Sequence, residues 1–154
     1  ETATTGTAGL AEIALESLVP GETLPVGARL AVSRLGGAEV PVPPWAVVGL
    51  GRQDVLLRGA DLMICGSGHG IVSKTLLAGV PLVLVPGGGD QWEIANRVVR
   101  QGSGRLVRPL DAEALTAAVG AVLSSAACRA AARAAGESAA GVADPVRVCH
   151  DAVR

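Results

Sequence analysis

The chain has 154 residues and a formal net charge of −1, and hydrophobic residues make up 49% of it. This composition is typical of one globular domain and excludes a disordered chain, and the near-neutral charge predicts no basic surface for nucleic acid. The only Phe, Tyr or Trp residues are Trp45 and Trp92, so the sequence also offers no aromatic platform on which single-stranded nucleic acid would stack. Aliphatic side chains and alanine must therefore build the core, as they do around buried parallel strands.

The first half of the chain predicts a helix followed by three short strands. Apolar residues recur at helical spacing over residues 10–19, and Pro20 and Gly21 end that pattern. The strands are expected over residues 28–35, 45–50 and 62–65, with a turn-rich connection at 36–44 and one or two helical turns at 53–58. Because residues 62–65 are all apolar, we expect a central strand there.

The second half predicts strands and helices in alternation. Strands are expected at residues 81–86 and 105–108, and helices at residues 72–78, 91–101 and 112–123, the last capped by Asp111. The remainder is alanine-rich helix, broken near Gly141 and Pro145. Strands alternating with helices indicate an α/β fold, a Rossmann-like three-layer sandwich with a mostly parallel sheet. Since a helix comes first, we expect that the strand opening such a unit is missing.

Two glycine-rich loops follow neighbouring apolar strands, and each leads into a helix. The first spans residues 66–70 (Gly-Ser-Gly-His-Gly) and the second residues 87–90 (Gly-Gly-Gly-Asp). Ligands of open parallel sheets lie beyond the carboxyl ends of the strands, where glycine lets the backbone approach a phosphate and a helix N-terminus offers free N–H groups. Two such loops in succession favour a ligand that carries a diphosphate and a sugar.

Two phosphate-binding motifs match this region only in part. Residues 68–75 differ from the Walker phosphate loop at Ser73, where that motif has glycine. Gly66 and Gly68 fit the first two positions of the dinucleotide fingerprint, but Ile71 occupies the third.

A third pattern extends over about 60 residues. Its parts are Ala60-Asp61-Leu62, the glycine loop 66–70, Ala78-Gly79-Val80-Pro81, Pro86, Asp90-Gln91 and Gly102-Ser103-Gly104. In order and spacing it resembles the donor domain of GT-B glycosyltransferases, which include the macrolide and glycopeptide transferases and the peptidoglycan lipid-intermediate N-acetylglucosaminyltransferase. The resemblance implies that residues 1–154 are a single nucleotide-sugar donor-binding domain, one half of a GT-B fold, with the N-terminal acceptor domain absent.

The resemblance also implies roles for individual residues. The nucleotide base is expected at residues 50–53, which include Gln53. The diphosphate is expected at Ser67, Gly68, His69 and Gly70, and the sugar hydroxyls at Asp90 and Gln91. Two positions depart from the family pattern: Gly66 stands where many members have a phosphate-binding histidine, and Lys74 where members have a ribose-binding glutamate. Lys74 is therefore expected either to neutralise a phosphate or to mark altered donor binding.

The resemblance implies transfer of a sugar from a nucleoside diphosphate sugar to a small or lipid-like acceptor. The sugar is expected to be linked to UDP or dTDP. The catalytic base is expected in the absent domain, so this chain alone should be inactive. A non-catalytic nucleotide-sugar-binding or partner module, or a nucleotide-sugar epimerase, stays open as an alternative. We expect no metal, no other cofactor and no nucleic-acid partner, and a cytoplasmic location with peripheral membrane contact of the full protein. The three cysteines, an odd number, are typical of reduced thiols.

Overall fold

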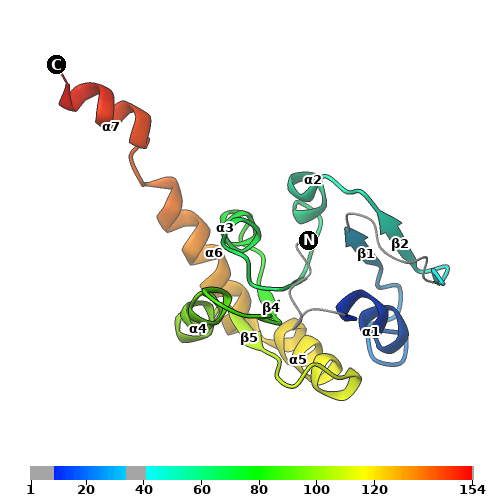
Figure 1. Cartoon of the computed structure of the whole chain (residues 1–154). Helices are drawn as coiled ribbons and strands as arrows, with labels where there is room; N and C mark the ends of the chain where they lie inside the picture. Colours follow the sequence, from blue (N-terminus) through cyan, green and yellow to red (C-terminus); the bar gives the residue numbers. More distant parts are fainter. Residues whose placement is uncertain (1–8, 34–40, 154) are drawn as a thin grey trace.

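The computed structural model describes residues 9–33 and 41–153 and has an α/β fold (Figure 1). Its strands are β1 (Leu30–Ser33), β2 (Ala46–Gly49), β3 (Met63–Cys65), β4 (Leu82–Leu84) and β5 (Gly104–Leu106). Its helices are α1 (Leu10–Ser17), α2 (Gln53–Leu57), α3 (His69–Leu77), α4 (Gln91–Gln101), α5 (Ala112–Ser124), α6 (Ala126–Ala140) and α7 (Pro145–Ala152). The expected fold class is therefore confirmed.

All the paired strands are parallel, and they form two sheets. β3, β4 and β5 make a three-stranded sheet in that order, and β1 pairs with β2 in a second sheet. Cys65 lies opposite Leu84, and Leu84 lies opposite Leu106, so the three strands of the larger sheet end at the same level. The loops that follow these strands are consequently neighbours at one edge of the sheet.

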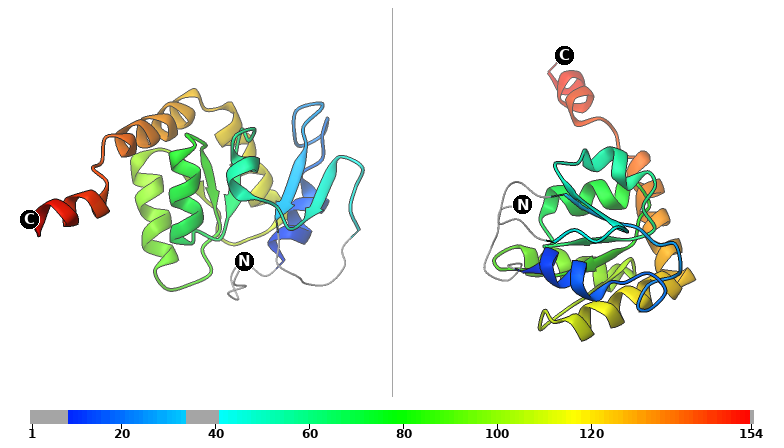
Figure 2. Two further views of the ribbon diagram at one scale, coloured as in Figure 1. Left: turned by 90° about the horizontal axis from the view of Figure 1, so that it is seen from above. Right: turned by 90° about the vertical axis from the view of Figure 1, so that its right-hand side faces the viewer.

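The core lies on both faces of β4, whose three residues are fully buried. Val83 belongs to a cluster that contains residues of α1 and α5, whereas Leu82 and Leu84 belong to a cluster with Val72 of α3 and Val98 of α4. Successive side chains of a strand point to opposite faces, so one buried strand joins the two clusters. Figure 2 shows α3 and α4 on one side of the sheet and α5 on the other.

The last two helices differ in how they meet the body. α6 packs along α3, and the two helices lie so close at Gly136 that a Cβ atom there would be 2.8 Å from the Leu76 carbonyl oxygen. α7 extends away from the rest of the fold, and its described side chains are exposed (Figure 1). The predicted break near Gly141 and Pro145 is confirmed, because α6 ends at Ala140 and α7 begins at Pro145.

The structure corrects two details of the prediction. β3 lies at the edge of its sheet and β4 at the centre, because an all-apolar strand indicates that both faces are covered and not that both edges are paired. α3 begins at His69, three residues before the expected start, because glycine at position 70 does not prevent a first helical turn. The strand expected at 28–35 is observed at Leu30–Ser33, and residues 34–40 of that strand and the following turn lie outside the described residues.

The helix start expected at Asp111 is confirmed. The Asp111 side chain accepts a hydrogen bond from the backbone N–H of Ala114 at 2.8 Å, which satisfies one of the free donors of the first turn of α5. Within the described ranges, no single helix is long and apolar enough to cross a membrane; α5 and α6 reach that length only as a pair bent by 75°.

Candidate functional site

The two glycine loops meet at the carboxyl edge of the three-stranded sheet. The first follows β3 and leads into α3, and the second follows β4 and leads into α4. Because β3 and β4 are adjacent and parallel, Gly68 and Asp90 lie at the same end of the sheet, as the sequence predicted. This edge is where ligands of open α/β sheets bind.

The N-terminus of α3 carries open hydrogen-bond donors. Gly68 is the N-cap residue, no side chain in the described part of the chain caps the helix, and its first turn has no acidic residue. The backbone N–H groups of His69, Gly70 and Ile71 lie in this first turn, where an α-helix offers no internal acceptor. Together with the helix dipole, which places about half an elementary positive charge there, they form the kind of helix end at which anions bind in proteins.

Ser67 immediately precedes this helix end and has an uncommon conformation. Its φ is +64°, in the left-handed region, which costs a non-glycine residue roughly 1 kcal/mol or more. Its side chain is fully buried, and within the described residues its hydroxyl has no hydrogen-bond partner. Buried polar atoms are normally satisfied, so this hydroxyl next to the helix end is an unexplained feature of the loop.

Gly68 and Gly70 leave space at the same place. Among the described residues, a Cβ atom on either glycine would have no neighbour within 4 Å, and neither glycine has a positive φ. Neither the local backbone nor the surrounding side chains therefore require glycine here. Absence of side chains lets a ligand approach the backbone amides closely. His69, the first residue of α3, is exposed at this opening.

The second loop places Asp90 and Gln91 in different roles. Asp90 occupies the N-cap position of α4, but its carboxylate makes no capping hydrogen bond and is exposed. The Gln91 side chain instead turns back into the loop, where its Oε1 accepts a hydrogen bond from the Gly87 N–H at 2.7 Å. The Asp90 carboxylate is thus open to a ligand, whereas the Gln91 amide oxygen stabilises the loop and leaves its NH₂ group as the free donor.

Gln53 and Lys74, which the sequence singled out separately, contact each other. The Lys74 ammonium on α3 donates to the Gln53 Oε1 at the start of α2, at 3.1 Å. This bond brings the loop that follows β2 to the side of α3. The residue before Gln53, Arg52, pairs with Asp54 at 2.7 Å, and that hydrogen bond lowers the pKa of the Asp54 carboxyl.

Trp92 and Arg108 are two residues of this edge that the sequence analysis did not assign to the site. The Arg108 guanidinium stacks 4.6 Å from the centre of the Trp92 ring, a cation–π contact. Both residues line a hollow of about 310 Å³ together with Pro86 and Gly87 of the second loop. Arg108 comes shortly after β5, so its place beyond a strand end was the available signal.

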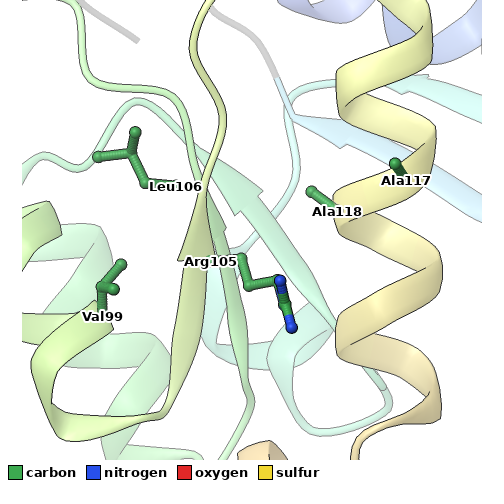
Figure 3. A pocket seen from close by; sticks show the side chains of 5 residues that line it. All are labelled: Val99, Arg105, Leu106, Ala117 and Ala118. Atoms are coloured by element: carbon green, nitrogen blue, oxygen red, sulfur yellow. The ribbon is translucent and has the colours of Figure 1, made fainter.

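A larger hollow, of about 380 Å³, lies elsewhere. It is lined by Val99 of α4, Arg105 and Leu106 of β5, and Ala117 and Ala118 of α5 (Figure 3). In Figure 3, Arg105 extends toward α5, and the other lining side chains are apolar. This hollow contains none of the predicted site residues. In the described part of the chain, no cluster of His, Cys, Asp and Glu has the arrangement of a metal site.

The chain is similar to sugar-transferring enzymes over the region that contains this site. The model of the Glycosyltransferase family 28 C-terminal domain matches residues 53–146, more than half of the chain. UDP-N-acetylglucosamine--N-acetylmuramyl-(pentapeptide) pyrophosphoryl-undecaprenol N-acetylglucosamine transferase of Nocardioides sp. is 37% identical over 79 residues, which are 49% of this chain and 22% of the relative. The corresponding enzyme of Saccharopolyspora erythraea is 41% identical over 81 residues, 51% of this chain and 21% of the relative. The chain thus spans about a fifth of the length of these relatives.

Solved structures share the fold over nearly the whole chain. The spinosyn rhamnosyltransferase SpnG complexed with thymidine diphosphate superposes with a TM-score of 0.78 at 24% identity, over 97% of this chain and 41% of that one. The spinosyn forosaminyltransferase SpnP superposes with a TM-score of 0.81 at 17% identity, over 99% and 41% of the two chains. At these identities the similarity establishes the fold.

Proposed function

Because the chain belongs to glycosyltransferase family 28, through the C-terminal domain of that family, we propose that it binds the nucleoside diphosphate sugar from which a larger enzyme transfers the sugar. The observation that carries the proposal is Ser67. A strained, buried serine with an orphan hydroxyl stands directly before a helix N-terminus that no side chain caps. A diphosphate at this place would satisfy both the hydroxyl and the free amides.

The described helices differ in whether a side chain caps their first turn. α5, α6 and α7 each begin with a side chain that accepts a hydrogen bond from the first turn, from Asp111, Ser125 and Asp144. α3 has no such acceptor, and neither have α1, α2 and α4, so the feature that distinguishes the start of α3 is the buried Ser67 hydroxyl beside its free amides. In the proposed complex the amides of His69 and Gly70 donate to the diphosphate, and exposed His69 lies beside it.

The sugar is proposed to lie against the second loop. The free Asp90 carboxylate would accept hydrogen bonds from sugar hydroxyls, and the Gln91 NH₂ group would donate to a sugar oxygen. The base is proposed to lie at residues 50–53, next to Gln53. The site thus presents donors for the anionic part of the ligand and an acceptor for its hydroxyls.

In the whole protein, an acceptor hydroxyl would attack the anomeric carbon while the bond to the diphosphate breaks. Negative charge then grows on the departing phosphate oxygen, and we propose that the N-terminus of α3 stabilises it. The base that removes the acceptor proton and the residues that hold the acceptor are proposed to belong to a second domain. SpnG was solved with thymidine diphosphate and the bacterial relatives are named for UDP-N-acetylglucosamine, so UDP and TDP are the nucleotides to test.

Isothermal titration calorimetry tests the proposal directly. We expect the protein to bind UDP or TDP, and to bind the matching nucleotide sugar more tightly. Ser67→Ala should weaken the binding of the nucleotide and of the nucleotide sugar by roughly tenfold, because it removes one hydrogen bond to a charged group, worth about 1.5 kcal/mol or more. Absence of binding for every nucleotide and nucleotide sugar offered would contradict the proposal.

A further inference from the structure

Lys74 reaches across to another helix instead of toward the helix end at which the diphosphate is proposed. It is the sixth residue of α3 counted from His69, so its Cα lies about 7–8 Å along the helix axis from that of His69. Its ammonium donates to Gln53 on α2 at 3.1 Å. Among the side-chain hydrogen bonds of the described residues, no other joins α2 to α3.

α2 depends on such contacts for its position. It has five residues, and a helix of that length is not stable in isolation. No side chain caps its start, and Asp54, Val55 and Leu56 are exposed, so Leu57 is its buried anchor. Leu57 fixes the end of α2, and the Lys74–Gln53 hydrogen bond fixes its beginning.

The loop that enters α2 has little else to hold it. Leu50 is 79% exposed, and Gly51 and Arg52 are exposed. The Ser33 hydroxyl contacts the Gly51 backbone N–H and carbonyl at 3.4 Å, which is long for a hydrogen bond. Gln53 is half-buried and ends this loop, so the bond to Lys74 is the short polar contact that ties residues 50–53 to the rest of the site.

We propose that Lys74 is a positioning residue that acts through Gln53: it holds residues 50–53 against α3 and thereby determines how tightly the nucleoside part of the ligand binds. This inference rests on the proposed function, and it replaces a phosphate contact by Lys74 as the reason for a lysine at this position. Without the bond, residues 50–53 occupy the binding-competent position for a smaller fraction of the time, and the apparent affinity falls in proportion to that fraction.

The proposal predicts different effects on two ligands. Lys74→Met and Gln53→Leu should each weaken UDP or TDP binding by roughly threefold to tenfold, and combining them should add little, because both remove the same bond. Binding of inorganic pyrophosphate, which has no nucleoside, should not change. Arg97→Met is the matched control, because it removes one exposed positive charge on α4 without touching α2.

A double variant that swaps the Lys74–Gln53 pair should restore the nucleotide affinity that the single variants lose. Lys74→Gln combined with Gln53→Lys keeps the same two side chains and the same total charge, and it exchanges donor and acceptor across the two helices. It should restore most of the UDP or TDP affinity. If Lys74→Met instead weakens pyrophosphate and nucleotide equally and Gln53→Leu has no effect, Lys74 contacts phosphate and the proposal is overturned.

Hydrogen–deuterium exchange separates this inference from the proposed function. In the ligand-free protein, amides of residues 50–57 should exchange faster in Lys74→Met and Gln53→Leu and return toward the wild-type rate in the swapped pair. Unchanged exchange in both single variants would overturn the positioning role even if nucleotide binds. A wild-type protein that binds no nucleotide would refute the proposed function while leaving this exchange result to decide the contact.

Discussion

Replacing Gly70 with alanine should separate folding from ligand binding. Gly70 is the second residue of α3, has no positive φ, and has no neighbour within 4 Å of a built Cβ. Alanine is favoured over glycine within helices by about 0.8–1.0 kcal/mol, and by less at a terminus. We therefore expect Gly70→Ala to stabilise the protein by about 0.5–1 kcal/mol, which raises the melting temperature by roughly 1–4 °C.

The same methyl group should obstruct the proposed diphosphate position. It would stand in the open space beside the amides of Gly70 and Ile71, and a phosphate oxygen displaced from one such amide loses a charge-assisted hydrogen bond worth about 1.5–3 kcal/mol. We therefore expect UDP or TDP to bind roughly 10- to 100-fold more weakly, as measured by isothermal titration calorimetry. Thermal melts of the same samples give the stability change.

Gly120→Ala provides the matched control. Gly120 lies on the exposed side of α5 and also has no neighbour within 4 Å of a built Cβ, so alanine should stabilise the helix there without affecting the ligand. The reasoning fails if Gly70→Ala binds nucleotide as tightly as the wild type. It also fails if Gly70→Ala destabilises the protein, because the position would then not be open.

Three further changes test other parts of the structure. Asp90→Asn should weaken the binding of a nucleoside diphosphate sugar by roughly tenfold and leave the binding of the sugar-free nucleotide unchanged. The α4 start should not be affected, because the carboxylate makes no capping bond. An equal loss of affinity for both ligands would exclude a sugar contact. Gly104→Ala should destabilise the protein by about 1–3 kcal/mol in urea unfolding, because its Cβ would lie 2.6 Å from the Leu82 carbonyl oxygen; a stability equal to that of the wild type would contradict this packing. Burial raises the pKa of the Cys128 thiol above its ordinary value of 9.0, although Arg105 and Arg129 oppose the shift. The protonated thiol is favoured in the folded state, so its contribution to stability is complete below pH 9.0 and is lost as the pH rises through the raised pKa. Urea titrations across this range should show the free energy of unfolding falling less steeply in Cys128→Ala than in the wild type.

The sequence was most informative where a local pattern determines the structure. Apolar runs such as the one over residues 81–86 indicated buried strands, and Asp111 marked the start of α5 because a capping side chain acts within one turn. The shared edge of the two glycine loops was also predictable, because parallel strands direct the loops that follow them to one side. These expectations are confirmed.

Contacts between residues far apart in the sequence could not be predicted from local patterns. Gln53 and Lys74 are 21 positions apart, and no local periodicity indicates that their side chains meet. The strained backbone of Ser67 was also missed, because serine is not a residue that normally marks a positive φ. The second domain, the lack of a metal and the cytoplasmic location stay predictions.

The pairing of Trp92 with Arg108 gives the molecule an internal optical reporter. Because the sequence has no tyrosine or phenylalanine, its intrinsic fluorescence comes from Trp45 and Trp92 alone. Trp45 directly precedes β2, whereas Trp92 lies in the hollow beside the second glycine loop with a cation stacked on its ring. In a Trp45→Leu variant, the emission of a single indole would report how the charge and solvent around that loop change when the site fills.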